Sequence, residues 1–405
     1  MTGSLLALVA IGKQDNDIIG NPTFSFFKSV YRRHTHFSME SIPVQFDQSF
    51  MFGKKTSVVI PRKGDLLHSL VLELKLPRLN SVGNDISWIN CVGHSLIKEI
   101  TLEIGGVKID SHTGEYLEIL SNLELPEEKR VGYQKMIGKH EYYNKYSQTN
   151  ATTLYVPLQF WFCRQIAQSL PLVAMQYHEV KISVILREFS ESWYSGSTMT
   201  NQPDPLMNIE GRLLCDFIFL NSNERRMFAQ NEHSYLIEQV QIQDGNGIGH
   251  NTVSDNIHLD FNHPVKDLFW IYRAEDVSLT NDWFNFSKTL NYIETKEEQQ
   301  EPITFCQWKI NGHDLMEEKA GDFFRLVVPY QRYARIPNNY IYVHSFANEP
   351  LKYQPTGHLN FSQIDSVVLS VKFADNIPSG NVIIYARNYN ILNIKEGMAG
   401  LQYSS

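Results

Sequence analysis

Short runs of alternating apolar and polar residues dominate the hydrophobic pattern of this chain. In the segment LLHSLVLELKLP, residues 66–77, Leu70, Leu72, Leu74 and Leu76 face one side, and the residues between them face the other. Because successive side chains of a strand point to opposite faces, this alternation predicts a β-strand with one buried face. Similar runs recur along the whole chain, at residues 56–61, 96–110, 178–189, 211–220, 364–373 and 381–392.

Helix signals are few and short by comparison. They occur at residues 21–33, 114–123, 224–230 and 321–326. Many short strands with connections rich in Gly and Pro, and little helix, indicate an all-β protein built from sandwiches. Four long polar stretches lack strand signals and are expected to be loops at the ends of the sandwiches, at residues 126–152, 188–209, 243–255 and 275–303.

An internal repeat divides the chain into two similar halves. IGGVKIDSHTGEYLEI begins at Ile104, and INGHDLMEEKAGDFFRL begins at Ile310. Each copy has an Ile, a turn that ends in Gly, an apolar residue three positions further on, and a Gly-acid-aromatic triplet that opens a short helix. A tandem duplication of one β-fold explains this pattern better than chance similarity between two hairpins, and 405 residues are too many for one ordinary β-domain.

The repeat and a charged stretch near its middle predict the domain boundaries. The charged stretch, LNSNERRMFAQNEHSY, follows a predicted strand that ends at Leu220. We therefore expect an N-terminal arm (1–21), a first sandwich (22–221), a linker (222–234), a second sandwich (235–396) and a C-terminal tail (397–405).

Charge and cysteine usage exclude several classes of protein. The net charge is −8 and no basic block occurs, so direct nucleic-acid binding is not expected. The four cysteines lie far apart without a CxxC pair, which argues against a zinc knuckle or a disulfide scaffold and indicates reduced thiols. The apolar run from Leu5 to Ile11 is too short to span a membrane and lacks a basic flank. A soluble chain whose first twenty residues form an extended arm is therefore expected.

Two histidines and a glutamate in the N-terminal region have the spacing of a metal site. His34 and His36, with Glu40 four residues further on, match part of the HxH…Glu motif of cupins, which are double-stranded β-barrels. The cupin motif also requires glycines at two positions that Lys28 and Asp47 occupy here. Its second half is approached by PTGHLN, but the spacing between Gly and His is missing. We therefore assign no metal ligands and expect both histidines in a packed junction.

No sequence motif identifies a catalytic or cofactor-binding residue. A GxSxG elbow, a P-loop and a dinucleotide fingerprint are all missing from the sequence. We therefore assign no catalytic or cofactor-binding residue. The alternative of a cupin-like metal-dependent enzyme or a carbohydrate-binding protein stays open, because the two acids of a glycosidase can lie far apart in sequence.

Three N-x-S/T sequons occur, at Asn150, Asn285 and Asn360. Asn150 and Asn285 fall in loops that are expected to be exposed, so these two are the possible glycosylation sites.

Residues 21–33 are predicted to form a short helix with one apolar face. The segment starts with an Asn suited to the N-cap and a Pro suited to the first helical position, and aromatic residues recur on one face. This face packs either under its own sandwich or against a neighbouring subunit, and two adjacent arginines are suited to anchoring carboxylates at an interface. The candidate assembly contacts are Phe24, Phe27, Tyr31, Arg32 and Arg33.

Three segments resemble the major capsid proteins of nucleocytoplasmic large DNA viruses. LVAIGKQDNDIIGNPTFSFFKSVYRRHTHFSMESI is similar to the N-terminal signature of that family. DFIFLNSNERRMFAQNEHSYLIEQVQ resembles its middle segment, and GHLNFSQIDSVVLSVKF with ARNYNILNIKEGMAGLQYS resembles its C-terminal one. The similarity covers essentially the whole chain in the right order. It departs at KQDN, which begins at Lys13, and the chain is short for the family, so its surface loops are expected to be modest.

The resemblance implies a fold, an assembly and a location, and a structural role without enzymatic activity or cofactor. The family fold is a double jelly roll, that is, two tandem eight-stranded antiparallel jelly-roll sandwiches with a few short helices. Three such chains form a homotrimer, a pseudo-hexameric capsomer that tiles an icosahedral shell. The implied partners are neighbouring capsomers, minor capsid and penton proteins and, indirectly, an internal viral membrane. The protein would be made and assembled in the host cytoplasm and reside in the virion.

Overall fold

The structure, a computed structural model, describes residues 2–79, 86–139, 151–195, 209–289 and 298–403. It divides into two units, Met1–His36 and Phe37–Ser405. None of its described helices is long and apolar enough to cross a membrane.

The first unit contains short helices but lacks the helix predicted over residues 21–33. Its elements are α1 (Gly3–Val9), the 3-10 turn η1 (Lys13–Asp15) and α2 (Asn16–Ile19). The arm expected at residues 1–20 therefore contains short helices. Residues 21–33 form neither helix nor strand, and Asn21 has φ +50° instead of the extended conformation of an N-cap. A helix of this length is marginal in water unless tertiary packing stabilises it, and its aromatic side chains are exposed.

The first sandwich consists of two four-stranded antiparallel sheets. In spatial order, one sheet contains β1 (Phe37–Gln45), β10 (Glu210–Leu220), β3 (Leu66–Leu76) and β7 (Thr152–Pro157). The other contains β2 (Lys55–Val59), β8 (Val180–Leu186), β5 (Ile97–Ile104) and β6 (Val107–His112). A separate short pair is formed by β4 (Ile86–Trp88) and β9 (Trp193–Ser195).

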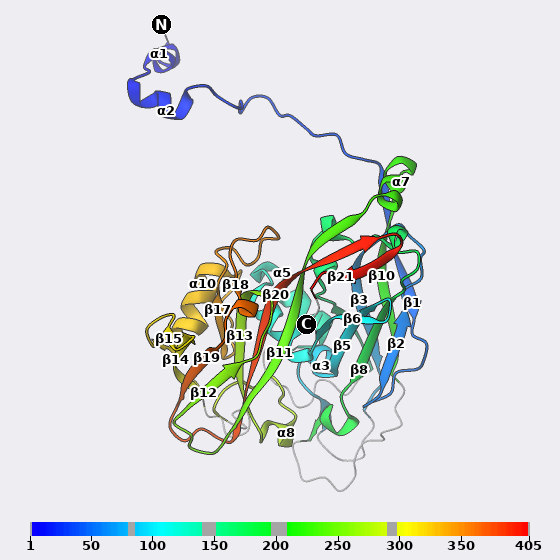
Figure 1. The fold of residues 1–405 in the computed structure, drawn as a ribbon, viewed down its shortest axis with the longest axis vertical. Coiled ribbons are helices and arrows are strands. Elements are labelled where there is room, and N and C mark those ends of the chain that lie inside the picture. The colour runs from blue at the N-terminus through cyan, green and yellow to red at the C-terminus, as the bar shows by residue number, and fades with distance from the viewer. Residues whose placement is uncertain (1, 80–85, 140–150, 196–208, 290–297, 404–405) are drawn as a thin grey trace. The chain divides into compact units, whose positions relative to one another are not determined.

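The second sandwich repeats the same strand order, and Figure 1 shows its strands beside those of the first. Its first sheet contains β11 (His233–Ile248), β20 (Gly380–Lys395), β13 (Pro264–Ala274) and β17 (Ile341–Ser345). Its second contains β12 (Ser254–Leu259), β19 (Val367–Phe373), β14 (Ile303–Ile310) and β15 (His313–Asp314). Three further short strands extend these sheets: β16 (Lys319–Ala320), β18 (Leu359–Asn360) and β21 (Met398–Leu401). The predicted fold of two tandem eight-stranded jelly-roll sandwiches is confirmed.

Short helices connect the strands. The α-helices are α3 (Val92–Ser95), α4 (Gly114–Leu123), α5 (Glu127–Ile137), α6 (Trp161–Arg164), α7 (Ser222–Gln230), α8 (Val277–Thr280) and α10 (Val328–Arg332). A π-helix, η5 (Phe323–Val327), runs directly into α10. The 3-10 turns are η2 (Ile166–Gln168), η3 (Leu172–Ala174), η4 (Phe189–Glu191) and η6 (Phe361–Gln363).

All four predicted loops contain regular structure: η4 and β9 lie within 188–209, and α8 lies within 275–303. The stretch 126–152 contains α5, which has two glutamates in its first turn and ends at Gly138 in the left-handed conformation that commonly terminates helices. Within 243–255, β11 continues to Ile248, and β12 begins at Ser254. The described residues of both segments are largely exposed, and polarity alone does not distinguish an exposed helix or strand from a loop.

The sequence repeat corresponds to the same local structure in each sandwich. The turn from β5 to β6 has positive φ at Gly105 and Gly106, and the turn from β14 to β15 has positive φ at Asn311 and Gly312. Both turns therefore have the positive φ at two central residues that a type I′ hairpin requires. The predicted duplication is thus present in the backbone as well as in the strand order.

Candidate functional site

The five predicted assembly residues lie in the first unit and are exposed. Their side chains are 70% exposed at Phe24, 99% at Phe27 and 80% at Tyr31, and both arginines are exposed. No helix places them on one face, contrary to the reasoning from the sequence. Their role in assembly stays a prediction.

His34, His36 and Glu40 are also exposed, so the expectation that both histidines sit in a packed junction is not met. The Nδ1 atom of His34 lies 2.7 Å from the carbonyl oxygen of Thr35. Among the described residues, Cys91, His94 and Glu118 form the grouping of three possible ligand atoms, and these three residues are described below.

Of the two possible glycosylation sites, the structure describes only Asn285. Asn150 lies outside the described residues. Asn285 is buried, and its side-chain nitrogen donates a hydrogen bond to the carbonyl oxygen of Thr289 at 3.0 Å. The prediction that Asn285 is exposed is therefore wrong. Glycosylation itself stays a prediction.

The helix α4 lies at a junction between the two sandwiches. Thr113 caps this helix by accepting a hydrogen bond from the backbone N–H of Tyr116. Leu117 packs in the core of the first sandwich, to which α4 belongs by sequence. The other apolar side chains of α4 belong instead to the core of the second sandwich: Tyr116, Ile119, Leu120 and Leu123. One helix thus contributes to two cores.

The C-terminal end of α4 is capped by the second sandwich. The backbone N–H groups of Ala334 and Arg335 both donate to the carbonyl oxygen of Leu123. The Arg335 guanidinium also donates to the carbonyl oxygens of Ser121 and Asn122, at 3.0 and 3.1 Å. Since the last carbonyls of a helix have no partner within the helix, these bonds fix the second sandwich to the end of α4.

A network of buried and half-buried charges lies beside α4 at the same junction. It contains equal numbers of carboxylates and cations, drawn from both sandwiches. The carboxylates are Glu124, Glu238 and Asp267, and the cations are Arg164, Lys266 and Arg387.

Arg387 is the centre of this network. Its Nε donates to Asp267 at 2.9 Å, and its Nη1 donates to Glu124 across the junction. Burial alone would raise the pKa of the Glu124 carboxyl, but Arg164 and Arg387 outweigh burial and lower it to about 2. Glu124 is therefore ionised at neutral pH, and the network is neutral as a whole because its three positive charges balance three negative ones.

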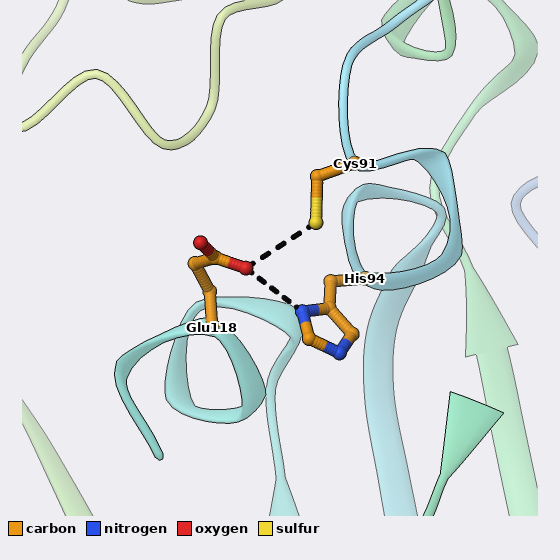
Figure 2. Close-up of side chains that lie close together, drawn as sticks. All are labelled: Cys91, His94 and Glu118. Atoms are coloured by element: carbon orange, nitrogen blue, oxygen red, sulfur yellow. Dashed lines mark hydrogen bonds and ion pairs between the residues drawn. The ribbon is translucent and has the colours of Figure 1, made fainter. Parts of the chain in front are cut away.

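A second buried polar cluster lies inside the first sandwich, between α3 and α4. Figure 2 shows the Cys91 thiol and the His94 ring directed at the same oxygen of Glu118, Oε2, with distances of 3.2 Å to Sγ and 3.0 Å to Nδ1. The other oxygen, Oε1, accepts hydrogen bonds from Asn122 and Lys139. Burial alone would raise the pKa of Glu118, but Lys139 and His94 hold it well below its ordinary value.

Cys91, His94 and Glu118 have the donor atoms of a zinc site, and these atoms lie within 4.8 Å of one another. Glu118 already accepts four hydrogen bonds, and the Lys139 ammonium neutralises its charge. A divalent ion bound by a thiolate and this carboxylate beside Lys139 would leave one uncompensated positive charge in a dry interior, which is costly. The arrangement therefore fits a structural hydrogen-bonded cluster better than a metal centre.

Sequence reasoning missed both polar clusters. The pair Cys91-x-x-His94 was a usable signal, because this spacing brings two side chains to one side of a short helix. The junction network had no such signal, since its members are scattered from residue 124 to residue 387.

Known proteins match this chain over its whole length. A family described as "Major capsid protein N-terminus" matches residues 25–221, and one described as "Large eukaryotic DNA virus major capsid protein" matches residues 224–400. The major capsid protein of Pyramimonas orientalis virus is 35% identical, and that of Paramecium bursaria Chlorella virus 1 is 32% identical, each over 100% of both chains. A structure titled "PBCV-1 virus capsid, quasi-atomic model" matches at a TM-score of 0.82 and 30% identity, over 94% of this chain and 100% of the other. The Faustovirus major capsid protein matches in fold, at a TM-score of 0.75 and 14% identity, over 97% of this chain and 96% of the other.

Proposed function

The chain belongs to the family of major capsid proteins of large eukaryotic DNA viruses, and we propose that three copies form a pseudo-hexameric trimer that tiles the capsid. The function predicted from the sequence, a structural capsid protein without enzymatic activity, is confirmed by this family membership. The same family membership argues against the alternative function, a cupin-like enzyme or a carbohydrate-binding protein.

The proposal of a trimer rests on the duplication of the sandwich. One chain contains two sandwiches with identical strand order. Three copies in a ring therefore present six similar modules, which approximate sixfold packing although the true symmetry is threefold. A tile of this kind can contact six neighbours in a shell. The partners proposed with it are neighbouring trimers, minor capsid and penton proteins and, indirectly, an internal membrane, after synthesis and assembly in the host cytoplasm.

Light scattering coupled to size-exclusion chromatography tests the trimer. The expected particle has three times the chain mass of 46.8 kDa and contains no stoichiometric metal. A stable monomer or dimer would contradict the proposal.

The N-terminal unit is proposed as an assembly contact between building blocks. Its helices have no buried residues, and the aromatic side chains that follow them are exposed. Exposed apolar side chains in such number usually mark an interaction site.

Deleting residues 1–33 tests this role. The shortened chain is expected to fold and to remain soluble but not to form shells. Phe27→Ser should weaken shell formation, while Val253→Ser, at a residue 75% exposed in the second unit, should not. Normal shells from the truncated chain would refute this role.

A further inference from the structure

A lysine and an asparagine of the polar cluster in the first sandwich contact the same carboxylate oxygen. The side chains of Lys139 and Asn122 both donate hydrogen bonds to Oε1 of Glu118, and the Asn122 nitrogen lies 2.8 Å from that oxygen. Since a hydrogen bond is about 3 Å long, the two nitrogens lie within about 6 Å of each other. An amine and an amide are thus neighbours on one acid group.

Water is largely excluded from this part of the cluster. The Glu118 side chain has no exposed surface, Asn122 is 4% exposed, and the Lys139 side chain is 20% exposed. An amine held beside an amide carbon reacts at a high effective concentration. Because hydrolysis needs water at the same carbon, burial favours attack by the amine. The exposed part of Lys139 leaves a route by which a small product can reach solvent.

The side-chain oxygen of Asn122 faces a cation from the second sandwich. The Nη2 atom of Arg335 lies 3.5 Å from this oxygen and donates to the carbonyl oxygen of Ser121 at 3.0 Å. The Nε atom of Arg335 donates to the backbone carbonyl oxygen of Asn122 at 3.1 Å, so the guanidinium is fixed there. A fixed cation beside a carbonyl oxygen stabilises the negative charge that develops when an amine attacks the carbon.

We propose that Lys139 and Asn122 form an isopeptide bond within one chain, with Glu118 as the group that transfers protons. The Lys139 ammonium passes one proton to Glu118, and the neutral amine attacks Cγ of Asn122. The carbonyl electron pair moves to Oδ1, which faces Arg335. Glu118 then donates a proton to Nδ2 of Asn122 and accepts one from Nζ of Lys139.

The reaction balances without any other reactant. The bond from Cγ to Nδ2 breaks, a bond from Cγ to Nζ forms, and ammonia leaves. No atom is oxidised or reduced. Glu118 ends as a protonated, neutral acid, so the loss of the lysine charge leaves no unpaired carboxylate in the interior, where such a charge is costly.

The charges of the pair make the reaction slow. Burial alone would lower the pKa of Lys139, but Glu118 outweighs burial and raises it. The same attraction, in the other direction, holds the pKa of Glu118 well below its ordinary value. The ion pair is therefore the common form, and the neutral amine that attacks is rare. Since the bond forms only once in each chain, a slow step after folding is sufficient.

The bond ties α5 to α4, the helix that contributes to both cores. Asn122 lies in the last turn of α4, and Lys139 directly follows Gly138, which ends α5. The four cysteines of the chain are free. The isopeptide bond is therefore a covalent link that needs no oxidation and that thiol reductants do not break. This inference goes beyond the proposed trimer and does not depend on it.

Mass spectrometry of the full-length chain tests the proposal. After purification and ageing, the chain should be lighter than its sequence mass by one molecule of ammonia. Trypsin should release a branched peptide that joins residues 109–129 to residues 136–145, because it cannot cleave after an acylated Lys139. The branched peptide separates this bond from a succinimide at an asparagine, which also loses ammonia but joins no second peptide.

Matched variants identify the reacting groups. Lys139→Arg keeps a cation beside Glu118 but removes the amine, so this chain should retain its full mass. The control, Lys135→Arg, alters an exposed residue in the last turn of α5 and should be cross-linked like the wild type. Asn122→Asp should reach the same cross-linked mass as the wild type, by loss of water instead of ammonia.

The wild-type measurement decides the matter even where a variant fails to fold. An aged wild-type chain that keeps its full mass and is cleaved after Lys139 would overturn the proposal, as would a branched peptide joined through a different pair of residues. Either result leaves the capsid function and the proposed trimer standing, because these are tested by particle mass and shell formation.

Discussion

The rings of Tyr116 and Tyr385 stack with their centroids 5.8 Å apart and an angle of 28° between their planes, although they belong to different sandwiches. Tyr116 is near the start of α4 and Tyr385 lies in β20. The hydroxyl of Tyr385 also lies 3.4 Å from the hydroxyl of Thr113, the N-cap of α4. The two sandwiches therefore share core side chains, and we expect them to unfold together.

Removal of the Tyr116 ring should destabilise both sandwiches. Tyr116→Ala leaves a cavity between α4 and the second core, and a loss of about 3–5 kcal/mol in the free energy of unfolding is expected, as for other buried aromatic residues. Urea-induced unfolding measures the change. Tyr177→Ala is the control, since Tyr177 is 75% exposed and its loss should cost less than about 0.5 kcal/mol. Two separate transitions in the variant, with one unchanged, would contradict a shared core.

Breaking the junction network should cost far more than breaking a surface ion pair. Arg387→Met leaves Asp267 buried without its guanidinium partner, and a loss of about 3–5 kcal/mol is expected. Lys75→Met removes the exposed pair between Lys75 and Glu210, at 3.2 Å, and should cost less than about 1 kcal/mol. Equal losses in the two variants would show that the network contributes no more than a surface pair. Denaturation midpoints at neutral pH provide the comparison.

Acid should weaken the junction over a defined range of pH. The pKa of Glu124 falls from an ordinary value of 4.5 to about 2 in the folded protein, because two guanidinium groups outweigh its burial. The unfolded chain thus takes up this proton at a higher pH than the folded chain. The stability that Glu124 provides is complete above pH 4.5 and is lost as the pH falls from there towards 2. Melting temperatures measured through this range should fall less steeply for Glu124→Gln than for the wild type. An identical slope would exclude Glu124 as a contributor.

The two helix-opening glycines should not tolerate a side chain. A Cβ on Gly114 or Gly321 would lie 2.2 Å from a backbone carbonyl oxygen, which cannot move away without distorting a neighbouring element. Gly114→Ala and Gly321→Ala should each cost about 3 kcal/mol, the upper part of the range for overpacked sites. Gly132→Ala in α5 is the control, because no atom lies within 4 Å of its Cβ position. It should stabilise the helix by about 0.5–1 kcal/mol, and thermal unfolding of the three variants tests the contrast.

Much of the architecture could be predicted from local patterns. The alternation in residues 66–77 predicted β3, and the Gly-acid-aromatic triplet predicted the start of α4 at Gly114. These predictions succeeded because strand alternation and turn geometry depend on residues close together in the chain. The helix predicted over residues 21–33 failed for a related reason, since a short apolar stripe needs a partner surface that local sequence cannot specify.

The sequence by itself determined that the chain is a duplicated β-sandwich protein and, through its resemblance to a family, that it builds capsids. Only the tertiary structure decided which surface of each sandwich is buried. It placed α4 between the sandwiches, gathered Glu124, Asp267 and Arg387 into one network, and left Tyr330 exposed on α10. The physical reason is that burial and charge pairing arise from contacts between residues far apart in the sequence. The local sequence pattern is the same in both halves of the repeat, so it cannot show which half is buried at a given surface.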